Sequence, residues 1–493
     1  MTNLKYTPEE PIAAIATALA PGALGIVRCS GKNCIGLLSK IFSRPKALLE
    51  AEGNTIVYGW IQTISNEKLE VSNYKDEGKE SGREKSCALH IANPSLHKLD
   101  EVLVSVFRSP RSFTGEDMVE ISCHGGVHVV QTVFNLLLKN GFRRAEKGEF
   151  TFRAYINGKT DLTKAEAVRE IIDSKTDESQ DRAAGRLAGN LYETIDGVKK
   201  HIIDTLAAIE VEIEYPEDEE TIADSFDASE LEKAKLALTE LRDSWKSEKI
   251  YQDGARVVLC GRTNAGKSSL FNALLKEDRA IVSDIEGTTR DFIESWIDFD
   301  GIPARLFDTA GLRETSDVVE AVGVERTKDL SEEADLILYL VDSKNGINQE
   351  DQAFISEHTS AAAKKIPLIL VWNKCEFSEG KFAPLNVADI PQVKISAKKG
   401  LGLGELSETV RKSLSVAEKP ERNSTGLGSE RQKIAVEKAL ESVSHALALT
   451  EDYALDAVVQ DLEDALDFLG EITGDVTPED VLDSIFSHFC VGK

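Results

Sequence analysis

A phosphate-binding loop is the feature that most constrains what this chain can fold into. The strand-like run Arg256–Cys260 leads into the loop Gly261–Ser268, with sequence GRTNAGKS, and the helical stretch Ser269–Leu275 follows. This is the Gly-x4-Gly-Lys-Ser motif in the strand–loop–helix context that it requires. Its glycines turn backbone N–H groups towards phosphates, Lys267 supplies a positive charge, and the Ser268 hydroxyl can ligate Mg²⁺. The loop therefore predicts a nucleotide-binding domain.

Four further motifs follow in the order expected of a GTP-hydrolysing domain. They are Gly287–Asp291 (GTTRD), Asp308–Gly311 (DTAG), Asn373–Glu376 (NKCE) and Ser396–Lys398 (SAK). A threonine of the first reaches Mg²⁺ only when a γ-phosphate is present. The aspartate of the second can hold a metal-bound water, and its glycine can donate an N–H to the γ-phosphate. The last two resemble the loops that read the base.

The base-reading motif has Glu376 where the usual residue is Asp. A carboxylate pairs with the N1–H and 2-amino groups of guanine, which adenine does not offer. The longer side chain either keeps this pairing at a shifted geometry or weakens it. We expect GTP rather than ATP.

The residue directly after the DTAG motif is Leu312, where Ras-like enzymes carry a glutamine that orients the attacking water. A leucine side chain cannot orient water. Hydrolysis therefore requires another water-positioning group and another positive charge at the transition state.

The alternation of apolar runs and helical stretches over residues 254–415 predicts a mostly parallel sheet with helices on both faces. Residues 1–157 are mixed, with strand-like Gly25–Arg28 and Val102–Phe107, helical Val127–Lys139 and a polar, loop-like run Ser65–Lys85. Residues 158–253 and 416–493 are helical. One apolar stripe predicts a long helix, and a second predicts its partner. The stripes are Leu187, Leu191, Ile195, Val198, Ile202, Leu206, Ile209 and Ile213, and Ala234, Leu238, Leu241 and Trp245.

The net charge limits the partners that the chain can bind alone. Its 493 residues include 58 basic and 85 acidic side chains, which gives −27. Phosphate contacts need Lys and Arg, so a nucleic acid would require a local basic patch or a partner protein. The seven cysteines are scattered, and no secretory signal or run of roughly 20 apolar residues is present. These features predict a cytoplasmic protein.

The chain resembles the MnmE (TrmE) family of tRNA-modification GTPases over nearly its whole length. The resemblance is carried by Ile12–Gly31, Ser112–Asp117 (SFTGED), Cys123–Gly126 (CHGG), Gly148–Ala154 (GEFTFRA), Asn157–Lys159, Ala165–Ala167 and Phe489–Lys493 (FCVGK). The last of these is the most specific, because P-loop GTPases at large do not share it.

The resemblance implies a multidomain α+β and α/β fold. Residues 1–157 would form a folate-binding and dimerisation domain, residues 158–253 and 416–493 a discontinuous helical domain, and residues 254–415 an inserted Ras-like G domain. It also implies a homodimer that works with the FAD-dependent GidA/MnmG subunit as a heterotetramer. The complex would add a (carboxymethyl)aminomethyl group at C5 of the wobble uridine of certain tRNAs, with a one-carbon unit from 5-formyl- or 5,10-methylene-tetrahydrofolate. No membrane is implied.

The resemblance also implies which residues hold the ions. Mg²⁺ would be held by Ser268 and Thr289. A K⁺ ion would replace the missing positive charge, and its ligands would be Asn264, Ser283, Ile285 and Thr288. Glu320 would position the water, and Glu320 and Lys267 would be the catalytic residues. K⁺-activated hydrolysis would be coupled to dimerisation of the G domains.

The remaining site residues follow from the motifs and the resemblance together. GTP would contact Asn264, Ala265, Gly266, Lys267, Ser268, Ser269, Ser283, Asp284, Ile285, Glu286, Gly287, Thr288, Thr289, Asp308, Thr309, Ala310, Gly311, Asn373, Lys374, Glu376, Ser396, Ala397 and Lys398. The folate would contact Arg28, Glu120, Lys159 and Lys493, and Cys490 is a candidate functional thiol that could equally be structural.

Two departures and two alternative functions remain. Thr263 replaces a proline common in the family loop, which leaves the loop less rigid. The first alternative is a ribosome-assembly or translation-associated switch GTPase with no modification chemistry, which the C-terminal FCVGK motif disfavours. The second is a helical scaffold with an inactive nucleotide site, which the presence of Lys267, Ser268, Thr289 and Asp308 disfavours.

Overall fold

The computed structural model describes residues 10–65, 95–214, 228–276, 294–308, 334–359, 366–377, 390–414, 426–450 and 455–492. The chain divides into two compact units. The first comprises Met1–Asp161 together with Thr477–Lys493, and the second comprises Leu162–Val476. Within the described ranges, no helix combines the length and the apolar character needed to cross a membrane.

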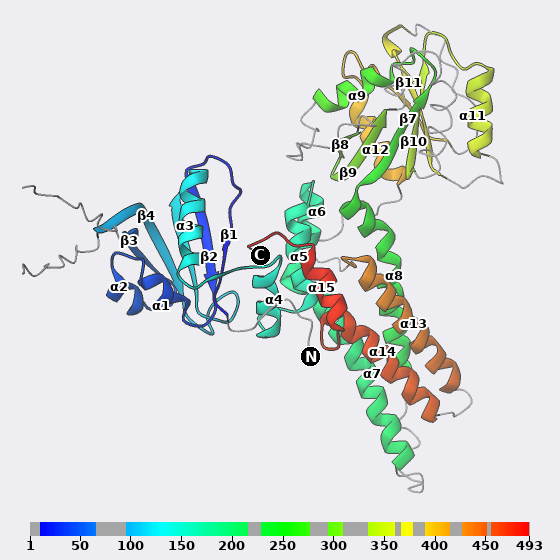
Figure 1. Ribbon diagram of the computed structural model, residues 1–493. Coiled ribbons are helices and arrows are strands. Elements are labelled where there is room, and N and C mark those ends of the chain that lie inside the picture. The colour runs from blue at the N-terminus through cyan, green and yellow to red at the C-terminus, as the bar shows by residue number, and fades with distance from the viewer. Residues whose placement is uncertain are drawn as a thin grey trace, which may run out of the picture. The chain divides into compact units, whose positions relative to one another are not determined.

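A six-stranded sheet forms the first unit, in the order β3-β4-β5-β2-β1-β6 (Figure 1). Neighbouring strands are antiparallel except β1 and β6, which are parallel. The strands are β1 (Ile12–Ile15), β2 (Leu24–Ser30), β3 (Thr55–Ser65), β4 (Ser95–Phe107), β5 (Met118–His124) and β6 (Arg143–Arg144). The helices are α1 (Cys34–Ser39), α2 (Pro45–Leu49), α3 (Val127–Lys139), α4 (Glu149–Ile156) and α15 (Glu479–Ser487).

The two faces of this sheet differ because side chains alternate along each strand. Val27 and Cys29 point to a core that α1 and α3 cover. Arg28 and Ser30 point to the opposite face, where Arg28 lies beside Glu120 of the neighbouring strand. The α4 residue Phe150 packs on this second face at the β1 edge. The second face therefore carries the polar residues expected to bind a ligand.

A helical part of the second unit contains six helices among its described residues. They are α5 (Leu162–Asp173), α6 (Asp177–Ala188), α7 (Asn190–Glu214), α8 (Ser229–Asp253), α13 (Glu430–Thr450) and α14 (Leu455–Thr473). Helices α7, α8, α13 and α14 share one apolar core. Both expected stripes line that core, apart from Leu187 and from Ile213, whose side chain lies outside the described residues.

Leu187 was wrongly assigned to the long helix. It lies in α6 and is 38% exposed, because Gly189 adopts φ 112° and ends α6 one residue before α7 begins. Glycine adopts this left-handed conformation at helix ends without steric cost. The expected helical segment 416–493 is also divided, since α15 belongs to the first unit while α13 and α14 belong to the second.

The second sheet carries the phosphate-binding loop. Its order is β12-β11-β10-β7-β9-β8, and every pair is parallel except β8 with β9. The strands are β7 (Ala255–Gly261), β8 (Glu294–Phe299), β9 (Ile302–Asp308), β10 (Leu336–Asp342), β11 (Leu368–Asn373) and β12 (Gln392–Lys394). The helices are α9 (Lys267–Lys276), α11 (Gln349–Thr359) and α12 (Leu403–Ser413), with a 3₁₀ turn at Cys375–Phe377.

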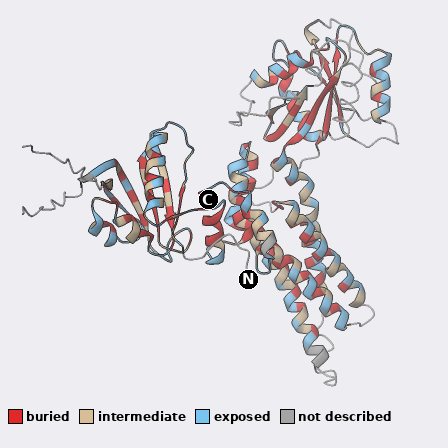
Figure 2. Cartoon of the chain, viewed as in Figure 1, coloured by how far each residue is buried: buried red, intermediate tan, exposed pale blue. Residues whose placement is uncertain are grey.

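Apolar clusters cover both faces of this sheet. Helices α9 and α12 pack on one face, and α11 packs on the other. Figure 2 shows the strands as the most continuously buried part of this domain. Strands buried on both faces read as unbroken apolar runs, as β10 and β11 do. The predicted combination of α+β, helical and α/β parts is confirmed.

Candidate functional site

The loop Gly261–Ser268 begins at the end of β7 and enters α9. Gly261 and Gly266 have φ angles of 131° and 99°, which favour glycine. A Cβ at Gly266 would lie 2.1 Å from Asn373 Nδ2. The Lys267 ammonium donates to the carbonyls of Gly261 and Arg262, at 2.7 and 3.0 Å. The lysine of the loop is thus held by backbone carbonyls of the same loop. Ser268 and Ser269 follow Lys267 in the first turn of α9.

Asn373 joins three of the sequence motifs. Its Nδ2 donates to the Ala265 carbonyl at 2.9 Å. Its Oδ1 accepts from the backbone N–H groups of Lys374, at 2.8 Å, and Ala397, at 3.1 Å. Because Asn373 is 2% exposed, these bonds lie inside the protein and fix the phosphate loop against both base-reading loops.

Lys374 makes a second connection to the phosphate loop. Its ammonium donates to the Asn264 carbonyl at 2.7 Å and to Asp342 Oδ2 at 2.8 Å. Burial tends to raise the pKa of Asp342, but hydrogen bonds from Lys374 and the Lys344 backbone outweigh it, so this pKa lies below its ordinary value. A charged Asp342 therefore holds Lys374 in place.

Glu376 and Ser396 present polar atoms that suit a purine base. The Glu376 Oε2 and Ser396 Oγ atoms are both buried, and neither makes a hydrogen bond of normal geometry to a described residue. Burial tends to raise the pKa of Glu376, but interaction with the Ser396 side chain outweighs it and holds this pKa below its ordinary value, so the two side chains act on each other. Buried polar atoms are otherwise nearly always paired. Ala397 is 7% exposed beside them. These atoms have the acceptor chemistry that guanine recognition needs, and Lys398 lies in the same loop.

Several expected nucleotide residues lie outside the described part of the chain. Asp308 ends β9, but its side chain is not among those described. The others are Ser283, Asp284, Ile285, Glu286, Gly287, Thr288, Thr289, Thr309, Ala310, Gly311 and Glu320. Lys493 of the expected folate set and most of the polar run Ser65–Lys85 lie outside it too.

A second polar site lies in the first unit, on the face of the sheet opposite the core that α1 and α3 cover. Arg28 Nε donates to Glu120 Oε1 at 2.9 Å, and Arg28 Nη1 donates to the Gly492 carbonyl at 3.1 Å. The guanidinium lies 5.8 Å from the ring centre of Phe113 and 5.7 Å from that of Phe150. The structure thus brings Arg28 and Glu120 together, with the C-terminal segment beside them.

Lys159 is held by a neighbouring loop. Its ammonium donates to the Pro110 carbonyl at 3.0 Å, and Asn157 Nδ2 donates to the Thr114 carbonyl at 2.7 Å. Among the described residues, no direct contact joins Lys159 to Arg28 or Glu120. Cys490 is exposed, and its carbonyl accepts from the Gly148 N–H at 3.5 Å.

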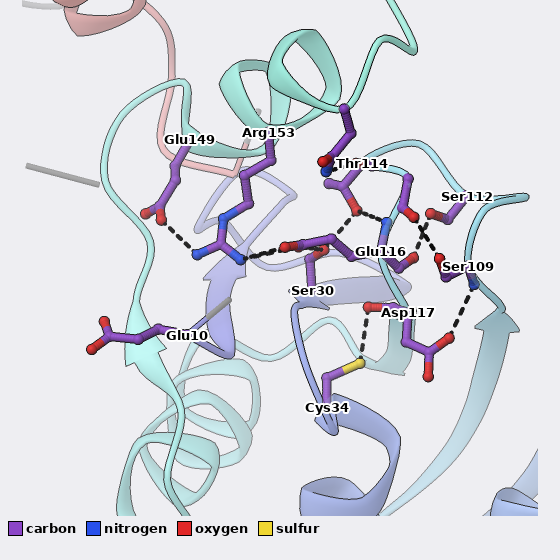
Figure 3. Close-up of polar contacts among 12 residues, drawn as sticks. Glu10, Ser30, Cys34, Ser109, Ser112, Thr114, Glu116, Asp117, Glu149 and Arg153 are labelled. Atoms are coloured by element: carbon purple, nitrogen blue, oxygen red, sulfur yellow. Dashed lines mark hydrogen bonds and ion pairs between the residues drawn. The ribbon is translucent and has the colours of Figure 1, made fainter. Parts of the chain in front are cut away.

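A network of ion pairs joins α4 to the loop that follows β4 (Figure 3). Arg153 lies between Glu149 and Glu116, with Nη–Oε distances of 2.9 and 3.0 Å. Glu116 also accepts from the Ser30 hydroxyl at 2.8 Å. The network connects α4, the loop after β4 and strand β2, two residues from Arg28. It therefore sets the position of the loop that carries Phe113.

Glu149 is the most buried charged member of this network, with no exposed surface. Burial tends to raise its pKa, but the hydrogen bond from Arg143, the backbone of Glu146 and the charge of Arg153 outweigh burial and hold the pKa below its ordinary value. Sequence reasoning assigned no role to Glu116, Glu149 or Arg153, although all three lie within motifs that carried the family resemblance. Their burial was the missing information.

The mostly parallel sheet, the loop around Lys267 and the NKCE motif that begins at Asn373 together define a P-loop GTPase domain. Solved structures with related sequences include Era of Aquifex aeolicus bound to GDP and aluminium fluoride, at 28% identity and a TM-score of 0.26, covering 38% of this chain and 67% of that one. The G domain of the T. maritima FeoB iron transporter matches at 28% identity and a TM-score of 0.24. The match covers 32% of this chain and 98% of the FeoB chain.

Comparisons over the whole chain are more specific. Residues 11–159 match the family model described as the GTP-binding protein TrmE N-terminus, and residues 162–490 match the MnmE helical domain. The tRNA modification GTPase MnmE of Treponema denticola is 49% identical, covering 99% of each chain. That of Borrelia turicatae is 39% identical, covering 100% of each. The chain belongs to the MnmE family of tRNA modification GTPases.

Proposed function

We propose that the chain hydrolyses GTP within a complex that adds a (carboxymethyl)aminomethyl group at C5 of the wobble uridine of certain tRNAs. GTP binding is supported by the buried hydrogen bonds that join Asn373 to Ala265 and Ala397. These bonds bring the phosphate loop and both loops expected to read the base to one place. Family membership carries the tRNA part. Hydrolysis drives conformational change rather than touching the uridine.

The hydrolytic mechanism uses K⁺ in place of an arginine finger. Leu312 cannot orient water, so the site needs a positive charge and a water-positioning group from elsewhere. Oxygen donors suit both ions: Asn264, Ser283, Ile285 and Thr288 for K⁺, and Ser268 and Thr289 for Mg²⁺. A K⁺ ion held by these residues would supply positive charge, while Lys267 binds the phosphates and Glu320 orients the water.

Turnover in matched salts tests this mechanism. GTP hydrolysis measured in potassium chloride should be at least tenfold faster than in sodium chloride at equal ionic strength. Equal rates would exclude the K⁺ role. The Glu320→Ala variant should bind GTP with unchanged affinity and lose most of its turnover, and undiminished turnover would remove Glu320 from the mechanism.

The second site binds a tetrahydrofolate. Chemistry supports this assignment: the Glu120 carboxylate can pair with pterin amino groups, and the Arg28 guanidinium lies within 5.8 Å of two aromatic ring centres, of which Phe113 is 41% exposed. A flat heteroaromatic ligand suits such surroundings. Lys159 and Lys493 hold its acidic or carbonyl groups in this proposal, and Cys490 is a thiol near the same C-terminal segment.

The chain acts as a homodimer through its N-terminal domain. On the open face of the sheet, Tyr58 lies opposite Leu103 across β3 and β4, and Ile56 is next to them. These three side chains are 46–65% exposed, and a contiguous apolar patch of this kind marks an interaction surface. Leu103→Glu should shift the sedimentation of the protein from dimer to monomer, whereas Leu236→Glu, at an exposed position on α8, should not.

A partner protein supplies the positively charged surface for tRNA that this chain lacks. A net charge of −27 leaves little surface for RNA, so the FAD-dependent GidA/MnmG subunit carries most of the tRNA contact in a cytoplasmic heterotetramer. Nucleoside analysis of tRNA from a deletion strain tests the modification role directly. Unmodified wobble uridine is expected, and a normal nucleoside profile would instead favour a translation-associated switch GTPase.

A further inference from the structure

Arg262, the second residue of the phosphate loop, extends its side chain to Asp351 of α11. Its Nε bonds to the Asp351 carboxylate at 3.0 to 3.1 Å, and its Nη2 donates to the Gly346 carbonyl at 2.7 Å. The side chain therefore ties the loop to the segment that precedes α11 and to the first turn of that helix.

Asp351 is buried with no exposed surface. Besides Arg262, it accepts from the Tyr339 hydroxyl at 2.8 Å and from the Asn348 backbone N–H at 2.9 Å. Burial raises the pKa of Tyr339 well above its usual range, so this hydroxyl stays protonated and donates. Its other hydrogen-bond partners among the described residues are neutral, so Arg262 provides the positive charge that balances the buried carboxylate.

The same aspartate forms a capping box at the start of α11. The Asn348 side chain accepts from the Asp351 N–H at 2.9 Å, while the Asp351 side chain accepts from the Asn348 N–H. Such reciprocal bonds fix the first turn of a helix. Stacking of Phe354 on Tyr339, with ring centres 4.6 Å apart, holds α11 against β10. Asp351 is thus a rigid point to which the loop is attached.

The phosphate loop is consequently held from two sides. Asn373 binds Ala265 in its second half, and Asp351 binds the Arg262 side chain in its first half. The carbonyl groups of Gly261 and Arg262, which receive the Lys267 ammonium, belong to that first half. A shift of Arg262 would therefore move the backbone that positions Lys267.

We propose that Arg262 and Asp351 are positioning residues for nucleotide binding: the buried pair fixes the first half of the phosphate loop and couples the N-terminal turn of α11 to GTP and GDP affinity. This inference rests on the proposal that the loop around Lys267 binds GTP. It adds α11, which contributes no expected nucleotide contact, to the elements that set affinity.

The test compares GDP dissociation constants in the purified full-length chain with Mg²⁺ present. Arg262→Ala and Asp351→Asn should each weaken GDP binding about tenfold, and the double variant should be no weaker than the worse single variant, because both remove one interaction. Arg262→Lys should recover part of the loss of affinity.

Asn348→Ala is the matched control, since it removes a bond of the capping box and keeps the ion pair between Arg262 and Asp351. It should lower the melting temperature and leave GDP affinity within about twofold.

Three results would overturn the inference: wild-type GDP affinity in Arg262→Ala, multiplicative losses in the double variant, or an equal loss in Asn348→Ala. If Asp351→Asn fails to fold, the GDP affinities of Arg262→Ala and Arg262→Lys test the inference instead. Arg262 is partly exposed, so both of these variants should fold. Lys267→Ala separates the two proposals. Wild-type GDP binding in that variant would reject the nucleotide site itself, whereas its loss beside unaffected Arg262 variants would reject only the role of the pair.

Discussion

The side-chain amide of Asn373 donates a hydrogen bond to the backbone carbonyl of Ala265, which lies 108 positions earlier in the chain. The same side chain accepts from two backbone N–H groups, so it satisfies three buried polar groups at once. A residue expected to read the base therefore also shapes the loop expected to bind the phosphates.

Asn373→Ala should weaken GDP and GTP binding at least tenfold and lower the free energy of unfolding by about 2–4 kcal/mol, because it leaves buried donors and an acceptor without partners. Equilibrium binding of a fluorescent GDP and urea denaturation measure the two effects. Gln352→Ala, on the exposed side of α11, is the control. Unchanged nucleotide affinity in Asn373→Ala would contradict the proposed site.

Glu376 should determine the preference for guanine. Glu376→Ala should reduce the preference for GDP over ADP by about 100-fold, because the carboxylate that pairs with N1–H and the 2-amino group is removed. Glu376→Asp should keep the preference, since the carboxylate remains. Competition binding with GDP and ADP distinguishes the two variants. Equal discrimination by Glu376→Ala and the native chain would place base recognition elsewhere.

Arg28 should contribute strongly to folate affinity. Arg28→Ala removes the cation that lies close to the Phe113 and Phe150 rings and leaves Glu120 without its partner, so binding of 5-formyltetrahydrofolate should weaken at least tenfold. Isothermal titration measures the affinity. Arg44→Ala, an exposed position in the same unit, should bind as the native chain does. Tight folate binding by Arg28→Ala would argue against this site.

Arg153 should be essential for stability of the first unit. Arg153→Met removes the cation that the fully buried Glu149 shares with the neighbouring Glu116. Breaking a buried pair costs about 3–5 kcal/mol, and this range is an upper limit here because Arg143 still pairs with Glu149. Arg169→Met removes an exposed ion pair with Asp173 and should cost less than about 1 kcal/mol. Urea denaturation compares them, and similar losses in both variants would show that the network contributes little.

Glu170 should make the helical part less stable as the pH rises. Burial raises its pKa to about 7 from an ordinary 4.5, although Arg186 opposes this shift. The folded state therefore binds an extra proton between these values, and the free energy of unfolding falls as pH rises through that window. Glu170→Gln should remove this fall and stabilise the protein at pH 8 by about 1–3 kcal/mol.

Urea denaturation at pH 5 and pH 8 tests this effect, because only the higher pH forces the buried carboxyl of the native chain to ionise. Glu441→Gln, at an exposed position on α13, should keep the native pH dependence. A Glu170→Gln variant whose stability changes with pH as steeply as that of the native chain would assign the dependence to another group.

The strands of the G domain could be predicted because a strand buried on both faces is an unbroken apolar run. Strand β8 was missed, since Glu294–Phe299 mixes charged and apolar residues at the edge of the sheet. The break between α6 and α7 was missed for a different reason. The apolar stripe continues in phase across Gly189, so periodicity alone could not reveal the left-handed turn there.

The phosphate and base-reading loops could be predicted because their residues are contiguous and their spacing is specific. The ion pairs of Arg153 with Glu116 and of Arg262 with Asp351 could not, because each joins residues that are distant in sequence. An Arg or Glu that becomes fully buried reads in the sequence like any surface charge. Only the packing of α4 and α11 shows that these charges are paired inside the protein.

The bond from Arg28 to the carbonyl of Gly492 spans 464 positions. A ribosome produces the N-terminal sheet early, yet the segment that completes its polar face emerges only after the helical part and the G domain have been made. The polar face of the first unit therefore stays uncovered through most of synthesis. The bond to Gly492 can form only after everything between the two residues has been translated, which ties assembly of the proposed folate site to synthesis of the C-terminal segment.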